Sequence, residues 1–191
     1  MKKVFWSGLL AGFFLCSSAY AADYVIDSEK AHASISFKIQ HLGYSWIKGR
    51  FNTFTGNFSY DPQQPQNAKV EVNIDVASID TNYEKRDQHL RSSDFLNTNS
   101  FPQAHFVGES LQLQDDGTYL LHGEFSLHGV TNPLTIKVDK VGEGNDPWGG
   151  YRAGFEGETE FTIADYGMNV TRLGPGSQQV YLTLSIEGIR Q

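Results

Sequence analysis

Apolar and polar residues alternate along most of the chain in short runs rich in Phe, Tyr, Val and Ile. Ile35, Phe37 and Ile39 alternate with polar residues, and the same period of two recurs over 70–76 and 182–186. Such alternation is typical of strands with one buried and one solvated face. Because helical periodicity is nearly absent, the buried faces need either a second sheet or closure into a barrel. The pattern therefore predicts an all-β domain.

Turn-forming sequences rich in Asp, Asn, Gly and Pro separate the predicted strands. The hairpin that turns at Asp116-Gly117, with Leu111 and Leu121 on its two arms, is the most clearly indicated pairing. We expect strands near 24–26, 33–41, 48–60, 69–79, 105–114, 118–127, 134–142, 152–163 and 179–188.

The stretch 80–99 departs from the alternation. Thr81 and Glu84 have the spacing of a capping box, which marks the start of a helix. We expect one or two short helices here, with a contact between Asp87 and Arg91 one turn apart. The helical segment would cap an open end of the barrel with its apolar residues, which are Tyr83, Leu90, Phe95 and Leu96.

The N-terminus has the features of a secretory signal peptide. Two lysines precede an apolar stretch at 4–15, and Ala19-Tyr20-Ala21 has the small-x-small pattern of a cleavage site. We therefore expect a signal peptide at 1–21 and one β-barrel domain at 22–191. The lone cysteine, Cys16, would leave with the signal, so no disulfide would hold the mature fold. Export of the mature chain is therefore expected.

Charge limits the partners that this chain is expected to have. The formal net charge is −7, and it becomes more negative once the lysines of the signal are removed. Such a charge disfavours nucleic acid and anionic membrane surfaces. We expect no nucleic-acid partner and no stable membrane insertion. A transmembrane β-barrel would show the same alternation with its faces reversed, but many of the runs are shorter than the roughly 9 to 11 residues that cross a bilayer.

Candidate catalytic and metal-binding groups lack the spacing that their chemistry needs. No two of the six histidines form an HxH pair, and nothing around Ser92 or Ser93 resembles a nucleophile elbow. The acidic loop 142–150 lacks the ligand spacing of a calcium loop, and we interpret it as a solvated turn anchored by Trp148. We expect no metal, no cofactor and no catalytic residue. The aromatic-rich interior is the best candidate, since a barrel of about eight strands can hold a ligand.

Short motifs occur in a fixed order along nearly the whole predicted domain. They are HLGYSW at 41–46, GRF at 49–51, FTG at 54–56, ASIDT at 77–81, RDQHLRS at 86–92, FPQAHF at 101–106, GEF at 123–125, LHGVTNP at 127–133 and RAGF at 152–155. Together these motifs resemble the bacterial YceI-like family of exported, lipocalin-like polyisoprenoid-binding proteins. Where that family commonly has an Asp-Phe-Gly element, this chain has Asp165-Tyr166-Gly167.

The resemblance implies a single eight-stranded antiparallel lipocalin-like barrel with one or two short helices capping it. It also implies a soluble periplasmic carrier whose long apolar pocket takes up a polyisoprenoid or similar long apolar lipid, isoprenoid quinones included. An enzyme that acts on a lipid or quinone in the same pocket is the main alternative. A structural or partner-binding protein with a filled interior is a further one. A homodimer is left open.

Face alternation assigns large apolar side chains to the lumen as candidate ligand-binding residues. These are Phe37, Ile39, Phe51, Phe58, Ile74, Val76, Phe106, Phe125, Leu127, Phe155, Phe161, Leu182 and Leu184. The polar candidates at the mouth of the pocket are His41, Arg86, Asp87 and His89. For Arg86 and Asp87, the alternative is that they only fix the capping helix to the barrel.

Overall fold

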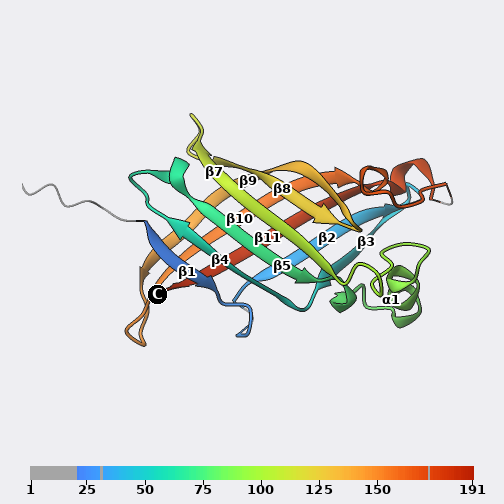
Figure 1. Cartoon of the computed structure of the whole chain (residues 1–191), viewed down its shortest axis with the longest axis horizontal. Helices are drawn as coiled ribbons and strands as arrows, with labels where there is room; N and C mark the ends of the chain where they lie inside the picture. Colours follow the sequence, from blue (N-terminus) through green and yellow to red (C-terminus); the bar gives the residue numbers. More distant parts are fainter. Residues whose placement is uncertain (1–20, 31, 172) are drawn as a thin grey trace, which may run out of the picture.

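Antiparallel strands follow one another around a closed barrel in the computed structural model of the chain (Figure 1). The structure describes residues 21–30, 32–171 and 173–191. The predicted signal peptide, apart from its last residue, therefore lies outside the described residues. The strands are β1 Ala22–Ile26, β2 Ser34–His41, β3 Ser45–Phe51, β4 Phe54–Tyr60, β5 Lys69–Asp75, β6 Ile79–Asp80, β7 Gln103–Leu113, β8 Tyr119–Leu127, β9 Val130–Asn145, β10 Tyr151–Thr162 and β11 Gln179–Arg190.

The ring of hydrogen-bonded neighbours runs β1-β4-β5-β7-β8-β9-β10-β11, and β11 closes it by pairing with β1. β11 also pairs with β2 over Val180–Ser185, so β1 and β2 lie one after the other along the same edge of β11. In the same way, β3 and β4 together occupy one strand position of the barrel, and β5 and β6 together occupy the next. Counting each of these three pairs as one interrupted strand gives the predicted eight-stranded antiparallel barrel, which is confirmed.

Two predicted strands are interrupted. The predicted strand 48–60 is divided between β3 and β4, and the predicted strand 69–79 ends as β5 at Asp75. The 3-10 helix η2, Val76–Ser78, then separates β5 from β6. The side chain of Asp75 accepts a hydrogen bond from the backbone N–H of Ala77 at 3.0 Å. This local contact competes with the strand, as is typical of Asp before a turn.

Two β-bulges change which residues face inward. Between Gly108 and Ser110 the register of β7 against β8 shifts, and a second shift lies opposite Gly154 and Phe155 in the pairing of β9 with β10. An extra residue in one strand reverses the inward and outward positions that follow it. The predicted hairpin pair Leu111 and Leu121 is confirmed beyond the first bulge.

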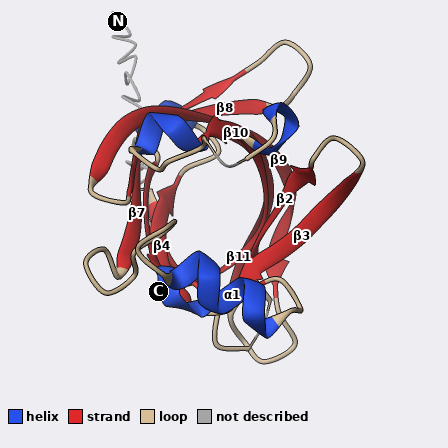
Figure 2. Ribbon diagram, turned by 90° about the vertical axis from the view of Figure 1, so that its right-hand side faces the viewer, coloured by secondary structure: helices blue, strands red, loops and turns tan. Residues whose placement is uncertain are grey.

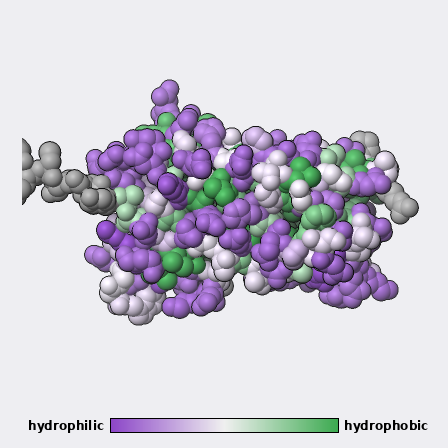
Figure 3. Space-filling model, in the orientation of Figure 1, coloured by the Kyte–Doolittle hydropathy of each residue, from purple (hydrophilic) through white to green (hydrophobic). Residues whose placement is uncertain are grey.

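The apolar faces of the strands point into the barrel. Viewed along the barrel axis, the strands form a ring around the core, and α1 lies beside the opening, at the rim of one end (Figure 2). The face of the molecule seen in Figure 3 is largely hydrophilic, with hydrophobic groups in small patches. Buried residues include Ile26, Ile74, Phe106 and Phe125, from four different strands. In the part of the chain that the structure describes, no helix is both long and apolar enough to span a membrane.

The two ends of the barrel carry different elements. Helix α1, Glu84–Arg91, lies at the end that also carries the β2–β3 turn and the 3-10 helices η3, Ile163–Tyr166, and η4, Pro175–Ser177 (Figure 1). We call this the α1 end. The C-terminus and the β7–β8 and β9–β10 turns lie at the opposite end, with the 3-10 helix η1, Pro65–Asn67 (Figure 1).

The short helix is confirmed, but the predicted capping box is wrong. Tyr83 is the N-cap residue, and no side chain caps the helix. The side chain of Thr81 is instead bonded to Asp87, inside the helix.

An ion-pair cluster around Arg152 holds the end of the barrel opposite α1. The Arg152 guanidinium donates to Asp27 Oδ2 and to Asp146 Oδ2, each at 2.8 Å, and also to Glu187. These contacts tie β10 to the end of β1, to β11 and to the β9–β10 turn. The His32 ring lies 3.0 Å from the same carboxylate of Asp27. Because Arg152 donates to them, the pKa values of the Asp27 and Asp146 carboxyls are held below their ordinary range.

Trp148, which was expected to anchor the β9–β10 turn, is 77% exposed and holds the turn by a contact in which the Arg152 guanidinium lies 5.5 Å from its ring centre. Asp146 is the anchor. Its Oδ1 accepts the backbone N–H groups of Trp148 at 2.9 Å and Gly150 at 2.8 Å.

Replacing Arg152 with Met should lower the melting temperature most at neutral pH. A carboxyl whose pKa is depressed on folding stabilises the fold above its unfolded pKa, and this stabilisation is lost as the pH falls through the folded pKa. The difference in melting temperature between wild type and Arg152→Met should therefore shrink as the pH is lowered from 7 to about 3. Lys137→Met, which removes an exposed pair with Asp116, is the control. A difference that stays constant across this range would contradict the prediction.

Candidate functional site

Two adjoining apolar spaces occupy the interior of the barrel. We call the first the inner chamber; it is lined by residues such as Ile26, Phe58 and Phe155 and has an empty volume of about 940 Å³. The second, the outer chamber, reaches the α1 end, where Leu42 and Leu90 line it, and has an empty volume of about 1480 Å³. Both volumes include the part that is open to solvent. The space that the centre of a water molecule can occupy is about 120 Å³ in the inner chamber and about 370 Å³ in the outer one.

The two chambers meet at a waist. Ile35, Ile74, Phe125 and Leu182 line both of them. These side chains come from β2, β5, β8 and β11, so the waist is built from strands all around the barrel. The four side chains therefore form the boundary that the two chambers share.

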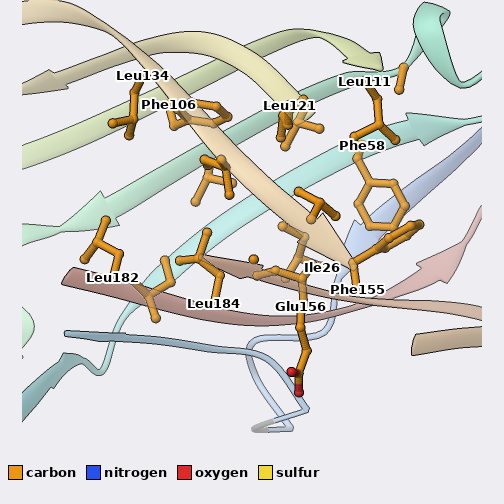
Figure 4. Close-up of a pocket in the computed structure, with 18 of the residues that line it drawn as sticks. Ile26, Phe58, Phe106, Leu111, Leu121, Leu134, Phe155, Glu156, Leu182 and Leu184 are labelled. Carbon is orange, nitrogen blue, oxygen red and sulfur yellow. The ribbon is translucent and has the colours of Figure 1, made fainter. Parts of the chain in front are cut away.

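The atoms that line the inner chamber are almost all carbon atoms. Its lining residues are apolar except Ser59, Tyr60, Gly157 and Glu156. The carboxylate of Glu156 points away from the cavity (Figure 4). The Tyr60 hydroxyl is buried and has no hydrogen-bond partner among the described residues. Its burial raises the pKa of the Tyr60 phenol, so this group stays neutral.

Most of the apolar residues that were predicted to face the lumen do line the cavity. Phe58, Phe106, Phe155 and Leu184 line the inner chamber, Phe37, Ile39, Phe51, Leu127 and Phe161 line the outer one, and Ile74, Phe125 and Leu182 line both. Val76 is the exception. It lies in the 3-10 helix η2 and is buried, but it lines neither chamber. The alternation that placed it in the lumen ends with β5 at Asp75.

Further lining residues were missed by the sequence analysis. Leu134, Ile136 and Val138 alternate with polar residues along β9, and this signal was available. Leu111 follows the β7 bulge, which reverses its face relative to simple alternation. Met168 lines the outer chamber from an irregular segment that has no periodicity to interpret.

The polar residues predicted for the mouth divide into two groups. His41, Arg86 and His89 line the outer chamber, whereas Asp87 does not. Asp87 is instead buried, with 3% of its surface exposed. Its two carboxylate oxygens accept the backbone N–H of Thr81 at 3.0 and 3.2 Å, and it also accepts the Thr81 hydroxyl. The structure therefore supports the alternative in which Asp87 fixes the capping helix to the barrel.

Arg86 extends the same contact toward the cavity. Its Nε donates to Thr81 Oγ1 and its second guanidinium nitrogen donates to the Thr81 carbonyl, both at 2.7 Å. No carboxylate lies within 4.0 Å of its nitrogens in the described parts of the chain. Arg86 thus both fixes the helix and presents a positive charge at the cavity mouth.

The expected contact between Asp87 and Arg91 does not form. Arg91 donates to the carbonyls of Ala77 at 2.7 Å and Ile79 at 2.8 Å, and so ties the helix to η2 and β6. Leu90, Phe95 and Leu96 line the outer chamber as expected. Tyr83 does not, since 56% of its surface is exposed.

The histidines do not gather into a metal site. His41 and His89 lie at the cavity mouth, whereas His105 bonds to Asn73 at 2.7 Å on the side of the barrel. Among the described residues, Asp27, His32 and Glu187 bring three donor atoms within 4.8 Å of one another. Because the Arg152 guanidinium already bonds to both of these carboxylates, it supplies the cation that they need.

Tyr166 packs behind the outer chamber. Its ring forms edge contacts with Phe125 and Phe161, with centroids 5.5 and 5.1 Å apart, and it does not line the cavity itself. Burial raises the pKa of its phenol. The Tyr in the Asp165-Tyr166-Gly167 element therefore supports two wall residues and leaves the apolar character of the cavity surface unchanged.

Comparison with known proteins finds relatives along the whole chain. Residues 24–188 match the YceI-like domain. A UPF0312 protein of Shewanella sp. (strain MR-7) is 53% identical over 192 residues, with all of both chains covered. A UPF0312 protein of Shewanella denitrificans is 54% identical, also over 192 residues and with all of both chains covered.

Solved structures share the fold at low sequence identity. Burkholderia cenocepacia BcnA is 18% identical, with a TM-score of 0.75 over 85% of this chain and 98% of its own. A Campylobacter jejuni YCEI protein is 23% identical, with a TM-score of 0.70 over 81% and 91%. A polyisoprenoid binding domain from Saccharophagus degradans, implicated in plant cell wall breakdown, is 16% identical, with a TM-score of 0.64 over 90% and 100%.

Replacing Asp87 with Ala should lower the free energy of unfolding by about 2 kcal/mol, because it leaves the buried N–H of Thr81 without an acceptor. Urea denaturation measures this change. Gln88→Ala is the matched control on the exposed side of the same helix, and it should alter the free energy by less than about 0.5 kcal/mol. Equal effects of the two substitutions would show that the Thr81–Asp87 contact does not hold the helix.

Proposed function

Because the chain belongs to the YceI-like family, we propose that it is a soluble periplasmic carrier that holds a polyisoprenoid or similar long apolar lipid inside its barrel. The observation that carries this proposal is the apolar cavity, whose two chambers adjoin at the waist. The polyisoprenoid binding domain from Saccharophagus degradans, which has the same fold, supports this ligand class.

The energetics favour a long branched hydrocarbon. Each isoprene unit has five carbons, so its burial stabilises a complex by about 4 kcal/mol at about 0.8 kcal/mol per carbon. Three units then contribute on the order of 12 kcal/mol before the loss of translational and conformational entropy is subtracted. Tight binding therefore needs few polar contacts, which agrees with the almost entirely apolar lining of the inner chamber.

The polar end of the cargo is proposed to lie in the outer chamber. Gln40, Thr81 and Ser177 line it together with His41, Arg86 and His89, so polar groups are concentrated toward the α1 end. A cargo with its tail in the inner chamber would place its head group among these side chains. An isoprenoid quinone fits this description, because its ring carries hydrogen-bond acceptors.

A carrier without catalytic activity is favoured over an enzyme. Asp87, the one carboxylate predicted for the mouth, is bonded to Thr81 and does not line the cavity. His41 and His89 do line it, but the side chains of His89 and its partner Asp94 are 58% and 60% exposed, so no water-excluded site surrounds this pair.

The proposed solubility and location have separate support. Polar side chains dominate the face seen in Figure 3, whereas the interior is apolar. A transmembrane barrel would carry its apolar band on the outside. The periplasmic location rests on the signal-like sequence at 1–21.

Mass spectrometry of organic extracts from the natively purified protein tests the proposal directly. We expect a co-purified isoprenoid lipid in near-stoichiometric amount, released into the periplasmic fraction by osmotic shock of the cells. Protein that carries no hydrocarbon, and that takes up none when incubated with polyprenols or isoprenoid quinones, would contradict it. Chemical conversion of the added lipid would instead favour the enzyme.

Phe125→Glu should abolish lipid co-purification, because it places a charge at the waist where both chambers meet. Burying an unpaired charge beside hydrocarbon costs several kcal/mol. Glu124→Gln, on the exposed face of the same strand, is the matched control and should retain full lipid content. Circular dichroism establishes that both variants fold. A folded Phe125→Glu protein with unchanged lipid would place the cargo elsewhere.

A further inference from the structure

The β2–β3 turn exposes a cluster of large apolar side chains beside the cavity mouth. Leu42, Tyr44 and Trp46 have 53%, 87% and 43% of their surfaces exposed. The turn lies at the α1 end (Figure 1), and Leu42 also lines the outer chamber. An exposed apolar surface is therefore continuous with the opening of the cavity.

Leu42 occupies a position that disfavours its own side chain. Its φ is +52°, in the left-handed region, and Gly43 follows at +81°. Tight hairpin turns with two such residues usually have Asn, Asp or Gly at the first position. The backbone N–H of Leu42 is held by Ser177 Oγ at 3.1 Å, which links this tip to η4. The turn thus keeps an exposed leucine in a costly conformation, and packing in the core does not account for it.

Basic side chains continue this surface along the outer faces of β2 and β3. Lys38 lies directly opposite Lys48 in the strand pairing, and both are exposed. Like charges placed directly opposite each other destabilise a sheet. In the described part of the chain, no carboxylate lies within 4.0 Å of either ammonium group. Arg50, next along the same face, is 3.8 Å from Asp80.

Aromatic rings accompany these cations. The Lys38 ammonium lies 5.0 Å from the centre of the Trp46 ring and 5.5 Å from that of Tyr181. The two rings meet edge to face with centroids 5.5 Å apart. Trp and Tyr rings beside Lys or Arg are the combination found where proteins contact the interface of a lipid bilayer.

Some acidic groups near this surface are paired with bases. Glu84 is 3.6 Å from Arg91 and Asp80 is 3.8 Å from Arg50, whereas Asp94 lies 3.2 Å from His89, which is a cation only when it is protonated. Exposed glutamates on β10 begin on the far side of β11, where Glu160 pairs with Tyr181.

The opposite end of the barrel also exposes apolar side chains, but its charge is different. Trp148 is 77% exposed there, on a turn that also carries Asp146. The β7–β8 turn at the same end carries Asp115 and Asp116. Asp146 is bonded to Arg152 and Asp116 lies 3.8 Å from Lys137, so these charges are paired with bases, whereas the basic charges of Lys38 and Lys48 at the β2–β3 end have no such partner among the described residues.

We propose that the outer face of the β2–β3 hairpin is a docking surface for an anionic phospholipid bilayer. We call it the mouth face and define it by Lys38, Leu42, Tyr44, Trp46, Lys48 and Arg50. The chain as a whole is acidic, so binding is expected to be oriented and reversible, with only this face on the membrane. The proposal extends the carrier function: the cavity opens beside the contact, so a lipid passes between bilayer and barrel without crossing water.

Sedimentation with lipid vesicles tests the docking surface. The full mature chain should bind vesicles of equal parts phosphatidylglycerol and phosphatidylcholine, and it should bind phosphatidylcholine alone much more weakly. Raising the salt concentration should release it, because exposed charges are screened. Replacing Lys38 and Lys48 together with Gln should weaken binding about thirty-fold, since each lysine near an anionic surface contributes about five-fold.

Two further variants separate the two ends of the barrel. Tyr44→Ser combined with Trp46→Ser should also abolish vesicle binding, whereas Trp148→Ser at the opposite end of the barrel should leave it unchanged. The melting temperature of Lys38→Gln/Lys48→Gln should equal or exceed that of wild type, because the substitution removes a repulsion. Loss of binding together with unfolding would be an ordinary structural defect and would overturn this part of the argument.

The outcomes also separate docking from cargo binding. The amount of lipid extracted from the mouth-face variants should equal that from wild type. Vesicle binding is therefore tested independently of whether the barrel carries a lipid. Three results would overturn the docking proposal: no vesicle binding, equal binding to both compositions, or equal loss in Trp148→Ser. A change in the sedimentation coefficient of the variants, without any vesicle binding, would assign the face to a second copy of the chain.

Discussion

Everything in this molecule depends on the pairing of its first strand with its last. Three residue pairs join β1 to β11, from Tyr24 with Arg190 to Ile26 with Gly188, and six more join β2 to the same edge of β11. The seam is tight: a Cβ at Gly188 would lie 2.4 Å from the ring of Phe58, so only glycine fits there. Arg152 reinforces the same region from outside by bonding to Asp27 and Glu187. A closed ring leaves no unpaired edge there and gives the sheet an inside.

Closure also explains why the interior is suited to a guest. Side chains on a closed barrel point at one another across the axis, and at about eight strands they can either fill the middle or leave room for a ligand. In this barrel Phe125 and Leu182 narrow the middle into a waist, with a chamber on either side of it. Helix α1 lies at the rim of one end, held by Thr81, Asp87 and Arg91, so it does not enter the space between the strands.

Much of this architecture could be predicted from the sequence, because it follows from a period of two. The strands, the hairpin at Asp116-Gly117 and most of the cavity wall follow from alternation alone. The alternation of inward and outward side chains fails where a bulge inserts an extra residue or where the backbone leaves the strand. Val76 lies in a 3-10 helix, and Leu111 lies beyond a bulge; neither departure has a signal in a single sequence. The capping-box prediction failed because Thr81 and Asp87 satisfy each other instead.

The position of β11 has a consequence for the order in which the barrel forms. β1 and β11 are separated by nearly the whole described chain, and the backbone N–H of Gln191 donates a hydrogen bond to the carbonyl of Asp23 at 2.9 Å. Contacts between residues so far apart in sequence form slowly, because a long loop must be closed first. The pairing of β1 with β11 is therefore a late event, and until it occurs both strands present an unpaired edge to any neighbouring chain.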